Sequence, residues 1–115
     1  ASPNAIWMFM VRDNPHSVSV FHSHTTGRVE VTCDGRVECG RTSKFLDNGM
    51  SLSFSIGADH VKATCHVKPS MMSFKYQLVV NGNEIAPRLV GLSRIVRFCP
   101  GSVKKFPLSL GLQRI

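Results

Sequence analysis

Apolar and polar residues alternate along most of residues 1–85 of this 115-residue chain. In Ser51–Ile56, for example, Leu52, Phe54 and Ile56 alternate with three serines. Successive side chains of a strand point to opposite faces, so this pattern predicts a strand with one buried and one solvated face. Similar patterns predict strands over His16–His22, Arg28–Cys33, His60–Val67 and Phe74–Val80. Ala5–Val11 is apolar almost throughout, as in a strand that is covered on both faces.

Pairs of turn-forming residues separate these strands. Two-residue hairpin turns need positive φ angles, which Asn-Gly and Asp-Gly adopt at low cost. Such pairs occur at Asp34-Gly35, Asn48-Gly49 and Asn81-Gly82. We also expect a turn at residues 13–15 and a loop that begins at Pro69-Ser70, and a strand from Glu84-Ile85 that pairs with Phe74–Val80. Short strands at this spacing predict an all-β fold, an antiparallel two-layer β-sandwich.

The alternating pattern ends near Pro87, where the charge of the chain also changes. Six of the 14 Lys and Arg residues and none of the seven Asp and Glu residues lie in 88–115. Glycines and prolines interrupt this segment. We therefore predict a β-sandwich domain over residues 1–87 and a basic, partly ordered C-terminal extension over 88–115. Within the extension, we expect Leu89–Phe98 to cover a sheet edge and Gly101–Ile115 to be looser.

Short motifs follow one another in a fixed order over about residues 4–85. They are Ala5-Ile6-Trp7, Val18–His22, His24–Arg28, Val29–Val31, Asp34-Gly35, Phe54–Gly57, Lys62–Thr64, Phe74–Leu78 and Val80–Gly82. In this order they resemble the N-terminal β-sandwich domain of the Fas apoptotic inhibitory molecule family. The resemblance implies a cytosolic, non-enzymatic protein that opposes death-receptor apoptosis and limits protein aggregation through protein contacts. It transfers no catalytic residue to this chain.

The residues themselves also favour binding over catalysis. The carboxylates are scattered, and the chain has neither a glycine-rich phosphate loop nor a nucleophile elbow. The neighbours Cys65 and His66 would point to opposite faces of a strand, so they cannot form a catalytic pair. We therefore expect a protein-interaction module, with no catalytic, cofactor-binding or metal-binding residues, that binds a partner in apoptosis or protein quality control.

Exposed loops commonly carry recognition, so the loop His22–Arg28 and the turn Asp47–Gly49 are the expected contact regions. The candidate contact residues are His22, His24, Arg28, Asp47 and Asn48. The alternative function is binding of nucleic acid or an anionic membrane through the basic C-terminal segment. That alternative predicts binding that weakens steeply with salt, because contacts to phosphates release counterions.

His22 and His24 also form a His-x-His pair, which zinc sites in β proteins use. Further ligands would have to come from His60, His66, Cys33 or Cys65, and no established ligand spacing is present. We therefore expect His22 and His24 to face water.

The four cysteines and most of the aromatic residues are expected to have structural roles. Without a recognisable signal peptide, the cysteines are expected to be reduced thiols in the cytoplasm, with Cys33 and Cys65 as small core residues. Most aromatic residues fall at inward strand positions. The pattern assigns Trp7, Phe21 and Phe45 least clearly, and exposure of any of them would indicate a partner contact.

Overall fold

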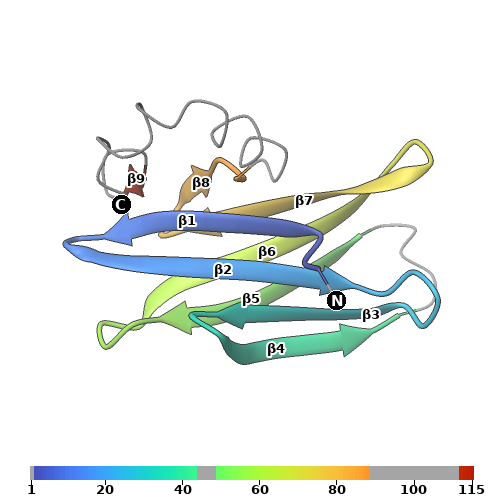
Figure 1. Cartoon of the computed structure of the whole chain (residues 1–115), viewed down its shortest axis with the longest axis horizontal. Coiled ribbons are helices and arrows are strands. Elements are labelled where there is room, and N and C mark those ends of the chain that lie inside the picture. The colour runs from blue at the N-terminus through green and yellow to red at the C-terminus, as the bar shows by residue number, and fades with distance from the viewer. Residues whose placement is uncertain (1, 44–48, 89–111) are drawn as a thin grey trace, which may run out of the picture.

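The computed structural model describes residues 2–43, 49–88 and 112–115, which form β-strands joined by short turns and contain no helix. The strands are β1 (Ala5–Val11), β2 (Asn14–His22), β3 (Arg28–Cys33), β4 (Arg36–Thr42), β5 (Met50–Ile56), β6 (Val61–Ser70), β7 (Ser73–Val80), β8 (Asn83–Ile85) and β9 (Gln113–Arg114). Figure 1 shows their arrangement.

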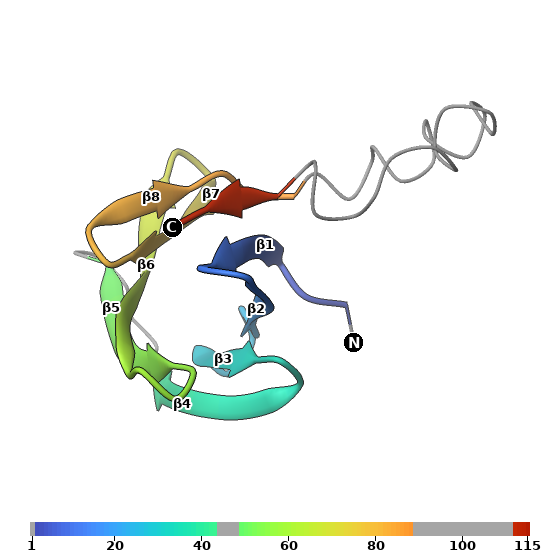
Figure 2. The same cartoon turned by 90° about the vertical axis from the view of Figure 1, so that its left-hand side faces the viewer.

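The strands form two sheets that face each other (Figure 2). The first sheet has the order β4-β3-β2-β1-β9, and the second has the order β5-β6-β7-β8. Every neighbouring pair is antiparallel except β1 and β9, which are parallel. The predicted all-β, two-layer sandwich is therefore confirmed. The predicted strand that follows Asn81-Gly82 is also confirmed, because β8 pairs with β7.

The core lies between the sheets and consists of the inward residues of the alternating strands. In β5, Met50, Leu52, Phe54 and Ile56 are buried and the serines between them are exposed. The rest of the core comprises Trp7, Phe9, Val11, Val18, Val20, Val29, Val31, Cys33, Ala63, Cys65, Val67, Leu78, Val80 and Ile85. Each large apolar side chain buried here contributes about 1.5–3 kcal/mol.

The aromatic and cysteine expectations have separate outcomes. Trp7 is fully buried, so it is not a surface contact, and Phe21 is half-buried. Phe45 lies outside the described residues. Cys33 and Cys65 are buried as predicted, and neither forms a disulfide in the structure.

The first hairpin turn lies earlier than predicted. Asn14 and Pro15 belong to β2 and pair with β1, and the turn consists of Arg12 and Asp13. Pro15 has no N–H to donate to a ladder, but β3 pairs with β2 only from Val18 onward. Pro15 is therefore tolerated beyond the end of β3, in the way that edge prolines are.

The hairpin of β6 and β7 is longer than predicted, because here too a proline lies within a strand beyond the end of its neighbour. Pro69 and Ser70 continue β6, and the turn is Met71-Met72. The neighbouring strand β5 pairs with β6 only as far as Val67, so Pro69 leaves no partner of β5 unsatisfied. The hairpin therefore extends beyond the rest of its sheet (Figure 1).

The end of the chain pairs with its beginning. β9 lies beside β1, and the Ile115 N–H donates to the Met10 carbonyl at 2.8 Å. The Gln113 side chain donates to the Glu84 carbonyl at 2.9 Å and accepts from the Ala86 N–H at 3.1 Å. β9 thus connects the edges of the two sheets. Residues 112–115, the end of the segment that was expected to be looser, include the short strand β9, while Leu89–Phe98 and residues 101–111 lie outside the described residues.

Candidate functional site

The loop between β2 and β3 forms one end of the sandwich, which we call the loop end (Figure 1). Its backbone is closed by its own hydrogen bonds. The Gly27 N–H donates to the Ser23 carbonyl at 2.8 Å, and the Ser23 N–H donates to the Arg28 carbonyl at 2.9 Å. Ser23, His24, Thr25 and Thr26 are exposed. The loop therefore presents polar side chains from a backbone that is already ordered.

His22 lies at the end of β2 and is buried, with 9% of its surface exposed. The Nδ1 atom of its ring lies 2.9 Å from the Tyr76 hydroxyl. The backbone N–H of His22 donates to the Asn4 side-chain oxygen at 2.8 Å. The expectation that His22 faces water is therefore wrong. The alternation of β2 continues through Val18 and Val20 to His22, which places this side chain on the core face.

Four rings connect the loop to β7. The His22 and His24 rings lie 4.5 Å apart between centroids, and the Phe74 ring lies 4.6 Å from His22 and 5.1 Å from His24. With Tyr76 they form the ring cluster. Offset and edge-on contacts of this kind add about 0.5–1.5 kcal/mol beyond burial. The cluster therefore holds the exposed His24 against the base of the β6–β7 hairpin.

The tip of that hairpin is the most exposed apolar feature of the described chain. Met71 and Met72, which we call the hairpin tip, are both fully exposed, and Met71 has a φ of 52°. This feature could not be recognised from the sequence, because no Gly or Asn marks the turn. Lys68 and Lys75 stand opposite each other three residues below the tip and are both exposed. The hairpin therefore projects beside the loop end, with an apolar tip and two lysines below it.

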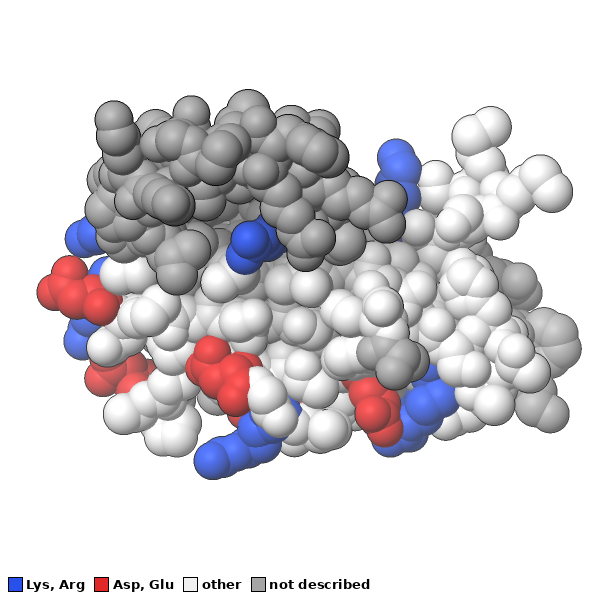
Figure 3. All heavy atoms as spheres, in the orientation of Figure 1, with Lys and Arg blue, Asp and Glu red and all other residues white. Residues whose placement is uncertain are grey.

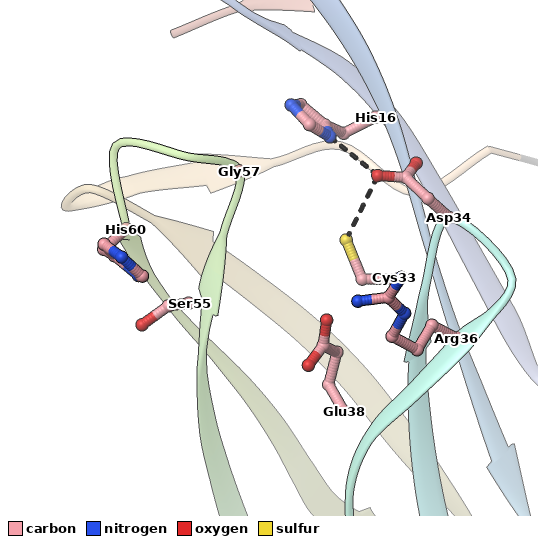
Figure 4. A pocket seen from close by; sticks show the side chains of 8 residues that line it. All are labelled: His16, Cys33, Asp34, Arg36, Glu38, Ser55, Gly57 and His60. Carbon is pink, nitrogen blue, oxygen red and sulfur yellow. Dashed lines mark hydrogen bonds and ion pairs between the residues drawn. The ribbon is translucent and has the colours of Figure 1, made fainter.

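The opposite end of the sandwich holds a polar hollow of about 470 Å³. Its lining is shown in Figure 4 and comprises His16, Cys33, Asp34, Arg36, Glu38, Ser55, Gly57 and His60. His16 Nδ1 lies 2.8 Å from Asp34 Oδ2, and the Ser17 N–H donates to Asp34 Oδ1 at 2.8 Å. The Cys33 thiol donates to Asp34 Oδ2 at 3.6 Å. The Asp34 carboxylate therefore contacts His16, Ser17 and Cys33 at this end of the sandwich.

The charge states in the hollow follow from these contacts. Burial, the adjacent Asp34 carboxylate and Glu38 raise the pKa of the Cys33 thiol to about 12. Burial acts to raise the pKa of Asp34, but the hydrogen bonds from His16 and Ser17 outweigh it and hold the pKa below its ordinary value. Near neutral pH, Cys33 is therefore a protonated thiol. A nucleophilic cysteine requires the thiolate.

A protein-family model matches the part of the chain that forms the sandwich. The model of the Fas apoptotic inhibitory molecule matches residues 3–87, which cover the sandwich from β1 to β8. The chain belongs to the Fas apoptotic inhibitory molecule family. A search of curated proteins returned no match. The family carries an apoptosis-related role.

In this Fas apoptotic inhibitory molecule relative, the candidate contact residues have different surroundings. His24 is exposed and His22 is buried. Arg28 is exposed, and its guanidinium donates to Glu30 at 3.4 Å and to the Thr42 hydroxyl at 3.4 Å. Asp47 and Asn48 lie outside the described residues. The structure therefore places His24 in the β2–β3 loop and Arg28 at the first residue of β3.

The basic extension of this family member lies largely outside the residues that the structure describes. On the face drawn in Figure 3, the described Lys, Arg, Asp and Glu side chains are scattered among uncharged ones. Residues 2–43, 49–88 and 112–115 include no helix that is long and apolar enough to cross a membrane.

Burial and the nearby His24 lower the pKa of His22 below its ordinary value of 6.5. The unfolded chain therefore takes up a proton at His22 before the folded chain does, and stability is lost as pH falls from about 6.5 toward the folded pKa. We expect wild type to lose more unfolding free energy between about pH 7.5 and about pH 5 than His22→Gln does. Gln retains a hydrogen-bonding group for Tyr76 and cannot be protonated.

Urea unfolding at both pH values measures this difference, with His24→Gln as the matched control. Burial of His22 is the larger cause of its lowered pKa and His24 the smaller one, so His24→Gln should keep most of the wild-type pH dependence. Equal losses in wild type and His22→Gln would contradict the prediction.

Proposed function

We propose that this protein is a non-enzymatic, cytoplasmic interaction module. In this proposal it opposes death-receptor apoptosis and limits protein aggregation by binding a protein partner. The partner would contact the hairpin tip and the adjoining loop between β2 and β3, which carries His24. Family membership supports the apoptotic role. The observation that carries the proposed contact surface is the full exposure of two consecutive methionines, Met71 and Met72, at a projecting turn.

No contact within the described chain compensates for the strained backbone of Met71 or for the exposure of both methionine side chains. Met71 holds a φ of 52°, which is uncommon for residues other than Gly, Asn and Asp. Neither side chain buries its apolar surface in the described chain. Positions that break local rules without a compensating contact are commonly functional. Methionine is a flexible, polarisable side chain that is used at adaptable binding surfaces.

The charges around the tip favour an acidic partner. Lys68 and Lys75 lie directly opposite each other, which is unfavourable within the hairpin. A carboxylate of the partner would relieve this repulsion, and complementary charge also speeds association. The partner that fits best is therefore a protein with an apolar groove and an acidic rim.

Replacing both methionines with serine tests the proposal. We expect Met71→Ser/Met72→Ser to weaken partner affinity by at least about tenfold, or 1.4 kcal/mol. The unfolding free energy should change little, because both side chains are fully exposed. A pull-down from cytosol identifies proteins that wild type retains, and titration with the purified partner gives the affinity.

Val37→Ser is the matched control. Val37 is the other large apolar residue exposed in the described chain and lies on β4, away from the β6–β7 hairpin. This variant should retain the partner. Equal partner affinity of wild type and the double variant would overturn the proposed surface.

A further inference from the structure

Three different metal-ligating side chains meet at the hollow end of the sandwich. His16 comes from the start of β2, Cys33 from the end of β3, and Asp34 from the turn that follows. Val18 pairs with Cys33, so the antiparallel register brings the start of β2 beside the end of β3. The alternation of both strands then turns His16 and Cys33 to the same face. Only this register brings the three residues together.

Their ligand atoms all lie within 4.8 Å of one another. His16 Nδ1 and Asp34 Oδ2 are 2.8 Å apart, and Cys33 Sγ and Asp34 Oδ2 are 3.6 Å apart. A tetrahedral zinc ion with bonds of about 2.0–2.3 Å holds its ligand atoms roughly 3.3–3.7 Å apart. His16 and Asp34 would have to move apart to admit the ion, and Figure 4 shows the His16 and Cys33 side chains both directed at the Asp34 carboxylate.

The backbone already orients the carboxylate. Asp34 adopts a φ of 52°, and its N–H donates to the Ser17 carbonyl at 2.7 Å. The Ser17 N–H in turn binds Asp34 Oδ1, which leaves Oδ2 directed at His16 and Cys33. Hydrogen bonds of this kind to the far oxygen of a carboxylate are a common support for metal ligands.

The hollow offers an entrance and two candidates for a fourth ligand. Cys33 is buried, whereas the Asp34 side chain is 49% exposed. Glu38 and His60 also line the hollow but lie outside the group of three, so one of these side chains would have to move to supply a fourth ligand. Arg36 lines it too, and its charge opposes a cation, whereas the carboxylates of Asp34 and Glu38 favour one.

We propose that His16, Cys33 and Asp34 bind a zinc ion. A set of one nitrogen, one sulfur and one oxygen suits zinc, whereas calcium and magnesium prefer oxygen ligands. On binding, the Cys33 S–H bond breaks, a sulfur–zinc bond forms and the proton passes to solvent. The hydrogen bond between His16 and Asp34 is replaced by two bonds to the metal. The ion would then join β2 to the β3–β4 turn.

Titration of the full chain with zinc chloride in a calorimeter tests the proposal. We expect one zinc ion per chain and release of a proton, which is measured by repeating the titration in buffers of different ionisation enthalpy. Cobalt should give the near-ultraviolet absorption of a thiolate-bound metal. Cys33→Ser should abolish that absorption and weaken zinc binding by at least about tenfold. Asp34→Asn, at an exposed position, should weaken zinc binding as well.

Two controls separate this site from others. Cys39→Ser removes another cysteine of the described chain that lies outside the three-residue cluster, and it should bind zinc like wild type. His24→Gln removes one half of the His-x-His pair and should also bind like wild type. The proposal is wrong if wild type binds zinc no more tightly than magnesium, or if Cys33→Ser and Asp34→Asn both retain wild-type affinity. Loss of binding in His24→Gln with retention in Cys33→Ser would also overturn it.

Discussion

Replacing Trp7 with alanine should lower the unfolding free energy by about 3–5 kcal/mol, the largest single-residue loss that we expect. Trp7 is fully buried in the centre of β1 and belongs to the core between the two sheets. Its removal takes away apolar contacts and leaves a cavity that the surrounding strands cannot fully close. A loss of this size is a large share of the 5–15 kcal/mol that stabilises a typical domain.

The indole nitrogen makes a second substitution informative. Trp7 Nε1 is buried and has no hydrogen-bond partner in the described chain. A buried donor without an acceptor costs about 1–3 kcal/mol, and Trp7→Phe removes that donor while it retains an aromatic ring. We therefore expect Trp7→Phe to cost less than half as much as Trp7→Ala.

Far-ultraviolet circular dichroism should follow the unfolding, because Trp7 is the only tryptophan of the chain and its fluorescence is lost in both variants. Val37→Ala, at an exposed position, should change stability by less than about 1 kcal/mol. Equal destabilisation by Trp7→Phe and Trp7→Ala would contradict this expectation and would indicate that the indole N–H has a partner.

Gly49→Ala should produce the second large effect, a loss of about 3 kcal/mol or more in unfolding free energy. Gly49 has a φ of +84°, and a Cβ there would lie 2.7 Å from the Val67 carbonyl oxygen. The strain of the left-handed conformation, about 1–2 kcal/mol, thus adds to a clash with backbone. Val67 pairs with Met50, so relief of that clash would disturb the β5–β6 ladder.

Gly82→Ala is the matched comparison for this prediction. Gly82 has a φ of +80°, but a Cβ there would meet nothing within 4 Å. It should therefore lose only the conformational contribution of about 1–2 kcal/mol. Chemical denaturation of both variants measures the difference, and equal losses would show that the contact with Val67 costs nothing.

The sandwich could be predicted because its strands obey a rule that is local in the sequence. Burial of one sheet face imposes a period of two, and residues such as Leu52, Phe54 and Ile56 display it directly. The turns at Arg12-Asp13 and Met71-Met72 could not be predicted in the same way. Arg12 and Met71, residue types that rarely adopt a positive φ, occupy the first position of these turns, and the paired strands on either side impose that conformation.

The two ends of the molecule depend on relations that the sequence does not display. The burial of His22 could have been predicted from the sequence, because the alternation of Val18 and Val20 extends to it. Its contact with Tyr76, however, requires the two sheets to be packed against each other. The pairing of His16 with Asp34 likewise depends on the register of β2 and β3. Long-range register and packing therefore set the limit of prediction.

The parallel pairing of β9 with β1 also bears on the order in which the molecule assembles. The β1–β2 and β6–β7 hairpins close over short, local turns, whereas Arg114 and Asp13, which are hydrogen-bonded beside β9, lie 101 positions apart. Closing so long a loop costs more chain entropy, and its contacts are few. β9 should therefore dock after the hairpins have formed. In the native state, the same strand should detach before the core opens, since short elements with few contacts have the lowest local stability.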